Sequence, residues 1–345
     1  MAEKIITIMG ITGKQGASVA DVFLRQGGWH IRGVTRDPSK PSSKVWADKG
    51  VELIKGDMND AALLKKAFAG SNVIFGVTDF WGITRDPKVQ ERAKASSITV
   101  NALAYDIEVQ QGRNIVDAAN ATLDTLDRFV LSTLSATKKW SKGKYSHVYH
   151  HDAKWEAVEY LKATYPELAK KTSYLQMSLY MTNWKDSGPL QVGKPQPDGT
   201  FVLRLPGNPD GPIAQVDARH DTGKSLVSRQ LTFLVSGEFV KALLKVPAGQ
   251  NLLGVASTLS WNEYVTLWGK IHGVTCRFER VDRKVLEDAV PGGIGEEFAE
   301  TYEYIAEFGC EGGDPTVVLP KDLGVDVPVY TVEEYIKDED WTSVL

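Results

Sequence analysis

Short apolar runs alternate with stretches of helical periodicity along the first half of the chain. The runs are rich in β-branched residues, which favour strands, and turn residues separate them. We expect strands at 5–8, 29–35, 51–57, 72–78, 128–133 and 174–179. Apolar residues spaced three and four apart predict helices at 17–24, 60–68 and 106–121. This alternation predicts an α/β fold, a Rossmann-type doubly wound parallel sheet with helices on both faces.

The pattern changes beyond about residue 185, where Pro and Gly interrupt short strand-like segments. One helix is predicted at 260–271, with Ser260 as N-cap, Glu263 as its capping-box partner and Gly273 near its end. Another is predicted at 296–308, a segment rich in Phe, Tyr and Ile. Such short elements indicate a smaller, irregular α/β domain.

These patterns divide the chain into two expected domains. Residues 1–185 are expected to form the Rossmann domain, and residues 186–345 the smaller substrate or lid domain. The segment near 213–235 is expected to return to the first domain. A cleft between the lid and the sheet is the natural place for a substrate.

Composition limits the expected location and partners. Acidic residues outnumber basic ones by 44 to 40, so we expect no direct contact with nucleic acid. The one dense basic cluster, at 138–144, is interpreted as a solvated loop or as a rim that attracts anionic ligands. Two cysteines, Cys276 and Cys310, are too few for a disulfide framework, and the first strand begins too early for a signal peptide. We expect a cytoplasmic protein, with nuclear location in addition as an open option. We expect no membrane span, because no apolar run approaches about 20 residues.

The most informative motif lies where the first strand ends. There the chain reads Gly10-Ile-Thr-Gly13-Lys-Gln-Gly16 and continues into a helix. Glycine lets the backbone turn sharply and approach a pyrophosphate closely, and the free N–H groups of a helix start favour an anion. The motif predicts a phosphate cradle, with a plain strand-to-helix turn as the alternative.

The end of the second strand bears on which dinucleotide would bind. An NAD site places Asp or Glu about twenty residues beyond the glycines, where it binds the ribose 2′-hydroxyl. This chain has Thr35 and Arg36 there, and Lys40 follows. A guanidinium suits a 2′-phosphate, so we favour NADP(H) over NAD(H), unless Arg36 is an ordinary surface residue.

Ligands of doubly wound sheets lie at the carboxyl ends of the strands. The candidate cofactor contacts there, besides Lys14 in the glycine turn, are Asp57, Met58, Thr78, Phe80, Tyr180 and Asn183. Asp57 would accept a hydrogen bond from the adenine amino group while Met58 packs on the ring; the alternative is a turn-forming Asp. Aromatic residues are either core or the wall of a substrate pocket, and the wall candidates are Phe80, Trp81, Trp140 and Trp184.

Candidate acid–base chemistry gathers on one further helix. Short-chain reductases use a Tyr four residues before a Lys, but Tyr149 stands five residues before Lys154, which separates the two side chains by roughly 140°. His150 has the four-residue spacing, so His150 or Lys154 itself is the candidate proton donor. The Lys154 ammonium would lower the pKa of His150 and favour neutral imidazole. We expect no metal, because His150, His151 and Asp152 point in different directions on a helix.

These segments resemble the NmrA-like family, atypical members of the short-chain dehydrogenase/reductase superfamily. The resemblance covers nearly the whole chain and no single segment decides it. The matching segments are 10–16, Thr35-Arg36, Gly56-Asp57, 108–112, 117–119, 150–154, 197–201, 217–221 and 291–295. The later segments look like fungal nitrogen-repression regulators, and 150–154 looks more like the human NADPH-sensing relative.

The resemblance implies a Rossmann domain with a small second domain and an NADP(H) site. The implied contacts are Gly10, Thr12, Gly13, Gln15, Gly16, Arg36, Lys40, Phe80 and Lys154. It leaves two functions open. One is an NADPH-dependent reductase of a small apolar or aromatic carbonyl, imine or activated alkene, which the clustered aromatics favour. The other is a redox sensor that binds NADP(H) without turnover and regulates a transcription factor or other protein, which the missing Tyr and the long segment 82–105 favour.

Overall fold

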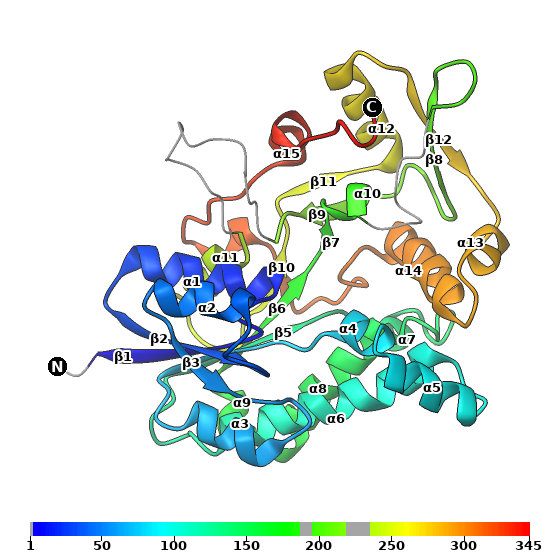
Figure 1. Cartoon of the computed structure of the whole chain (residues 1–345). Coiled ribbons are helices and arrows are strands. Elements are labelled where there is room, and N and C mark those ends of the chain that lie inside the picture. Colours follow the sequence, from blue (N-terminus) through cyan, green and yellow to red (C-terminus); the bar gives the residue numbers. More distant parts are fainter. Residues whose placement is uncertain (1–2, 187–194, 219–234) are drawn as a thin grey trace.

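The computed structural model describes residues 3–186, 195–218 and 235–345. Its centre is an eight-stranded parallel sheet in the order β13-β10-β6-β5-β4-β1-β2-β3 (Figure 1). The strands are β1 (Lys4–Met9), β2 (Trp29–Thr35), β3 (Glu52–Lys55), β4 (Val73–Gly76), β5 (Arg128–Thr133), β6 (Thr172–Met177), β10 (Asn251–Gly254) and β13 (Val317–Val318). The predicted doubly wound α/β fold is therefore confirmed.

Helices cover both faces of this sheet (Figure 1). On one face lie α1 (Lys14–Gln26) and α11 (Val235–Leu243), which pack together; the Gly237 N–H donates to Ser18 Oγ at 3.0 Å. On the other face lie α3 (Ala61–Phe68), α6 (Val100–Asn120), α8 (Tyr149–Thr164) and the short α9 (Pro166–Ala169). Central strands such as β6 are buried along their whole length, as expected for a parallel sheet covered on both faces.

Residues between β4 and α6, expected as extra length that could form a partner surface, are largely helical. They form α4 (Phe80–Thr84) and α5 (Pro87–Ala95), and Asp79 and Asp86 cap the two helices by accepting N–H groups. α2 (Pro41–Asp48) follows β2, and α7 (Thr137–Trp140) follows β5. Of the basic cluster 138–144, the three residues Lys138, Lys139 and Trp140 lie on α7.

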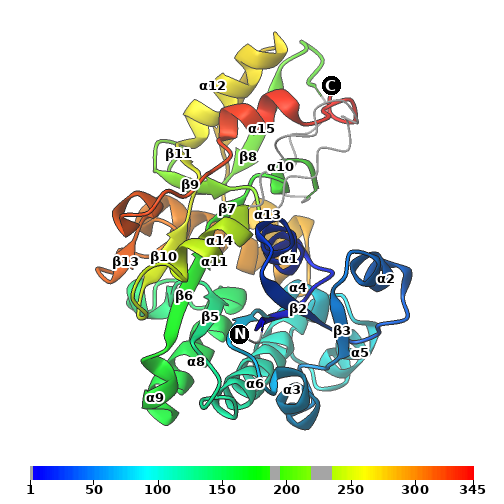
Figure 2. The same ribbon diagram turned by 90° about the vertical axis from the view of Figure 1, so that its left-hand side faces the viewer.

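A smaller part stands beyond the carboxyl edge of the sheet (Figure 2). It holds a three-stranded sheet, β11 (Ser257–Leu259), β9 (Ile213–Val216) and β7 (Leu179–Tyr180), and a parallel pair, β8 (Phe201–Leu205) with β12 (Cys276–Arg280). Its helices are α10 (Asn183–Asp186), α12 (Trp261–His272), α13 (Lys284–Ala289), α14 (Ile294–Phe308) and α15 (Val332–Asp338), and a 3₁₀ turn covers Pro320–Leu323. The predicted capping box of Ser260 with Glu263 is observed, and Gly273, predicted near the helix end, is its C-cap with a left-handed φ of 67°.

The chain crosses between the two parts more often than a boundary at residue 185 implies. β10 and β13, both from the second half, complete the large sheet next to β6. The segment near 213–235 does not join that sheet where it is described, because β9 pairs with β7 and β11 instead. Residues 219–234 of that segment lie outside the described residues. Within the described ranges, no helix combines the length and apolar character needed to cross a membrane.

Candidate functional site

The strand order reverses between β1 and β4, and this reversal brings the candidate residues to one edge. β1 pairs with β2 on one side, where Met9 aligns with Val34, and with β4 on the other, where Ile8 aligns with Phe75. Consequently the turn after β1, the loop after β2 and Thr78 after β4 leave the sheet at the same level. In open α/β sheets a ligand binds at such a switch point.

The glycine turn has the shape that close backbone approach requires. Gly10 takes a left-handed φ of 63°, and its carbonyl accepts the Gly13 N–H at 2.8 Å. At Gly16 a Cβ atom would lie 2.3 Å from the Gly10 oxygen, so only glycine fits there. α1 begins without a side-chain cap and without an acidic residue in its first turn. Its first N–H groups lack partners inside the helix, which suits an anion.

Side chains of the first helical turn tie this motif to neighbouring strand ends. Gln15 donates to Tyr180 Oη and accepts from Ser132 Oγ, both at 2.8 Å. Lys14 Nζ lies 2.8 Å from Thr182 Oγ1, in the loop that follows β7. Ser132 was not predicted as a site residue, although it lies at a predicted strand end.

The other residues predicted to contact the nucleotide differ in their solvent exposure. Thr12, Arg36 and Lys40 are exposed, and neither of the two cations forms an ion pair within the described residues. The exposed cations at the end of β2 fit the preference for a 2′-phosphate, which stays a prediction. Asn183 is partly exposed at the start of α10.

Asp57 and Met58 form the turn after β3. Asp57 Oδ1 accepts the backbone and side-chain N–H groups of Asn59, both at 2.9 Å, which is the turn-forming alternative expected for this Asp. The Met58 carbonyl accepts from Asn114 Nδ2 at 2.8 Å, and its side chain packs on the core. An adenine contact at these two residues remains a prediction.

Lys154 forms an ion pair with a residue that was not predicted from the sequence. Its Nζ lies 2.5 Å from Glu108 Oε1 on α6; the Glu108 side chain is fully buried and that of Lys154 is 11% exposed. Burial raises the pKa of Glu108 although the Lys154 ammonium opposes this shift. Glu108 Oε2 is buried without a hydrogen-bond partner among the described residues. The pair therefore places a cation and a buried carboxylate of raised pKa beside Thr78, at the edge where the candidate nucleotide site lies.

His150 is held in a neutral pair. Its Nδ1 lies 2.7 Å from Glu297 Oε1, which also accepts the His150 backbone N–H at 2.8 Å. Burial, and then the Lys154 charge, lower the pKa of His150 to about 3, which confirms the expected direction. Burial also raises the pKa of Glu297 to about 8. An imidazolium is therefore scarce near neutral pH, so His150 is a poor proton donor in this state.

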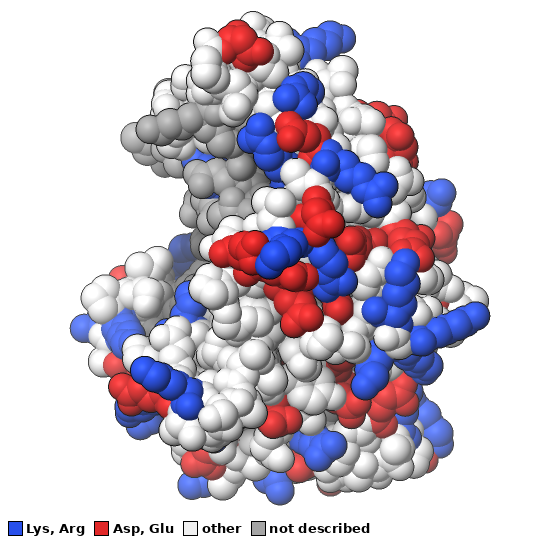
Figure 3. Space-filling model, turned by 90° about the vertical axis from the view of Figure 1, so that its right-hand side faces the viewer, with Lys and Arg blue, Asp and Glu red and all other residues white. Residues whose placement is uncertain are grey.

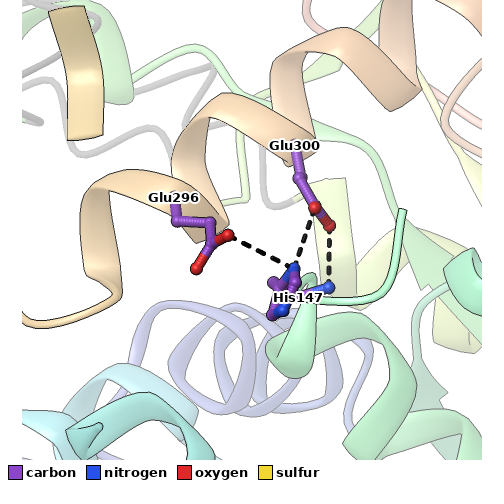
Figure 4. Close-up of side chains that lie close together, drawn as sticks. All are labelled: His147, Glu296 and Glu300. Atoms are coloured by element: carbon purple, nitrogen blue, oxygen red, sulfur yellow. Dashed lines mark hydrogen bonds and ion pairs between the residues drawn. The ribbon is translucent and has the colours of Figure 1, made fainter. Parts of the chain in front are cut away.

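The start of α8 is capped by carboxylates of α14 rather than by its own residues (Figure 4). Glu300 accepts the His147 backbone N–H at 2.7 Å and lies 2.9 Å from His147 Nδ1, while Glu297 serves His150 in the same way. Glu296 lies 3.6 Å from His147 Nδ1. His147, Glu296 and Glu300 are residue types that bind metals, but the Arg283 guanidinium lies 3.4 Å from Glu300 and repels a cation.

The aromatic candidates separate into two groups. Phe80 and Trp81 surround His150, with ring centroids 5.9 and 5.0 Å from the imidazole, and Trp81 also stacks on Phe298 at 5.1 Å. Phe80 itself is buried beneath Trp81.

Trp140 and Trp184 lie elsewhere. Trp140 packs against Gly312. Trp184 has no exposed surface and stacks on Tyr264 at 3.5 Å, so the prediction that it lines a substrate pocket is wrong: it belongs to the core of the smaller part. Tyr149 is the first residue of α8 and contacts Tyr105 and His147, away from Lys154.

The strand order, the switch point and the glycine turn define the protein as a member of the Rossmann-fold class. The chain belongs to the NmrA-like family, whose model matches residues 2–336.

Known relatives combine enzymes and regulators. The chain is 24% identical over 295 residues to the NmrA-like family domain-containing oxidoreductase hkm9 of Aspergillus hancockii, covering 81% of this chain and 76% of that protein. Its structure resembles NmrA, a negative transcriptional regulator, in complex with NADP, with a TM-score of 0.67 at 19% identity over 98% of this chain and 95% of that one. It also resembles the NADPH-dependent quinone oxidoreductase QOR2 of Escherichia coli in complex with NADPH, with a TM-score of 0.61 at 18% identity over 96% and 98% of the two chains.

Proposed function

We propose that the protein binds NADP(H) at the carboxyl edge of the large sheet. The glycine turn supports this, since the Gly16 position excludes any side chain and the start of α1 is uncapped. Arg36 and Lys40 would hold the 2′-phosphate. The structural relatives include NmrA in complex with NAD and with NADP, and QOR2 in complex with NADPH; they support a dinucleotide site, and the preference for NADP(H) rests on Arg36 and Lys40.

Replacing Arg36 by Glu tests the choice of nucleotide. A carboxylate there repels the 2′-phosphate and accepts from a ribose hydroxyl, so we expect NADP⁺ affinity to fall about tenfold or more while NAD⁺ affinity holds or improves. Calorimetry with both nucleotides measures this, with Lys44→Gln on α2 as an exposed control. Equal losses for the two nucleotides would contradict the assignment.

We further propose that the protein is an NADPH-dependent reductase of a small apolar or aromatic carbonyl, imine or activated alkene. The buried Lys154–Glu108 pair beside Thr78 is the observation that carries this proposal. When bound, NADPH supplies a hydride to the electrophilic carbon. Lys154 donates a proton from Nζ to the oxygen, nitrogen or carbon that gains the electron pair, and Glu108 holds the ammonium in place. Neutral His150 and Trp81 shape the apolar side of the site.

Lys154→Met removes the proton donor but keeps the length of the side chain. We expect turnover of a carbonyl, imine and alkene panel to fall at least about 100-fold, the usual range for a lost general acid. NADPH consumption is the readout, and Lys162→Met, exposed on the same helix, is the matched control. If Lys154→Met reduces a substrate as fast as the control does, Lys154 is not the donor.

The neutral His150–Glu297 pair favours a second function, a redox sensor that binds NADP(H) without turnover. In this case NADP⁺ and NADPH shift the contact between α8 and α14 unequally and thereby alter binding of a transcription factor or other protein partner. Hydrogen exchange of α14 with each nucleotide measures this. Identical exchange with NADP⁺, NADPH and no nucleotide would argue against the sensor.

A further inference from the structure

A groove of about 730 Å³ lies between α4–α5 and the start of α14. This volume is within the range of sites for small organic ligands. Trp81 lines it, whereas His150 and Lys154 do not. The large apolar residues that line it are Trp81, Ile98, Val100, Pro291, Ile294 and Phe298.

Part of the groove lining is aromatic and apolar. The rings of Trp81 and Phe298 are stacked with centroids 5.1 Å apart and planes inclined by 23°. Ile98 leaves 44% of its surface exposed, which is unusual among the large apolar residues of the described chain. A planar apolar group is the natural partner of such a surface, since it would bury both rings and Ile98.

The remaining features of the groove favour an anion. Arg85 and Lys94 line it, and both are exposed and without an ion-pair partner in the described part of the chain. Two helix starts also line it: Thr99 and Val100 open α6, and Ile294 opens α14, whose N-cap has no side-chain hydrogen bond. Helix starts carry partial positive charge.

The two acidic residues in the first turn of α14, Glu296 and Glu297, interact with groups outside the groove. Glu296 lies 3.6 Å from His147 Nδ1, and Glu297 accepts from Asn101 and His150. Neither residue lines the groove.

We propose that this groove is a second ligand site, which binds a small planar carboxylate with an aromatic body. The ring system packs on Trp81, Phe298 and Ile98, and the carboxylate lies toward Arg85, Lys94 and the two helix starts. The site is separate from the proposed nucleotide and proton-transfer residues. It touches them only through Trp81, whose ring is 5.0 Å from His150.

Calorimetry of the full chain with 2-naphthoate tests the proposal. Removing both cations in R85Q/K94Q is expected to raise the Kd about fivefold, a modest loss because exposed ion pairs are weak. The double variant K88Q/R92Q is the matched control, since both of its residues are exposed on α5 outside the groove. Uncharged 2-naphthalenemethanol should bind at least about fivefold more weakly than the acid.

Two further measurements locate the probe. Ile98→Asp alters an exposed residue, adds a negative charge to the groove and should weaken 2-naphthoate more than tenfold, roughly the effect of a like charge at close range. Saturating NADP⁺ should leave the Kd unchanged. No saturable binding, equal loss in the two double variants, equal affinity for the alcohol, or competition by NADP⁺ would each overturn the proposal, and none of these outcomes bears on Lys154 or the reductase proposal.

Discussion

Single residues set the chemical character of the site through what they are paired with. Lys154 is held by a carboxylate that shares the sheet edge with it but comes from a different helix, 46 positions away. His150 is neutral because burial and the same lysine oppose its protonation. The spacings of Tyr149 and His150 from Lys154 could be read from the sequence. The partners Glu108 and Glu297 could not, because they come from other helices and meet α8 only in the folded protein.

Removing Glu108 tests how far this pair supports the fold. Glu108→Gln leaves the Lys154 ammonium buried without a counter-charge, so we expect a loss of about 3–5 kcal/mol in the free energy of unfolding. Urea denaturation measures this. The double variant E108Q/K154M should recover most of the loss, because no unpaired charge remains. A single variant as stable as wild type would show that the ion pair contributes little.

At the scale of elements, the capping of α8 by α14 joins the two parts of the chain by buried groups that titrate. Glu297 keeps its proton to a pH of about 8 in the folded protein, because burial raises its pKa from the unfolded value of 4.5. A raised pKa stabilises the fold below the unfolded pKa, and that stability is lost as the pH rises through the folded pKa. The pKa of His150 is lowered, so this residue has the opposite effect: between about pH 3 and 6.5 it makes the folded state more stable as the pH rises.

Between pH 6.5 and 8, therefore, Glu297 but not His150 should change the stability of the fold with pH. We expect the free energy of unfolding to fall with rising pH, by up to about 1.4 kcal/mol per pH unit from this one proton. Glu297→Gln should flatten the slope, and Glu296→Gln, its more exposed neighbour on α14, should not. Denaturation at half-unit pH steps decides; equal slopes in both variants would refute this account.

Sequence patterns predicted those elements whose signal is local. The central strands β1, β4 and β5 were predicted because their apolar runs are buried on both faces. α12 was predicted because Ser260, Glu263 and Gly273 are typical capping residues. β10 and β13 were not predicted: β13 has only two residues, and β10 lies in a half of the chain where strands do not alternate regularly with helices. α5 was missed because polar residues dominate its sequence, and α4 because five residues are too few to show a helical period.

Whole-molecule properties follow from how often the chain returns to the large sheet. Lys and Arg are interspersed with Asp and Glu on the face seen in Figure 3, with no continuous basic area there. That nucleic acid is not a direct partner stays a prediction from the net charge. The same returns make the boundary at residue 185 a poor place to divide the protein.

A fragment of residues 1–185 should consequently fail to fold. It lacks β10 beside β6, α11 against α1 and the α14 carboxylates that cap α8. We expect a fragment without a cooperative thermal transition in circular dichroism, and recovery when residues 186–345 are expressed with it. A soluble fragment that unfolds cooperatively would mean that the first half is an independent domain.

The caps that α14 supplies to α8 also have a consequence for the order of folding. His147 and His150 contact residues about 150 positions later in the chain. During synthesis, the first turn of α8 must wait with unsatisfied N–H groups until α14 has left the ribosome. The helix that carries Lys154 is therefore completed late, and an incomplete chain would not yet hold a finished site for proton transfer.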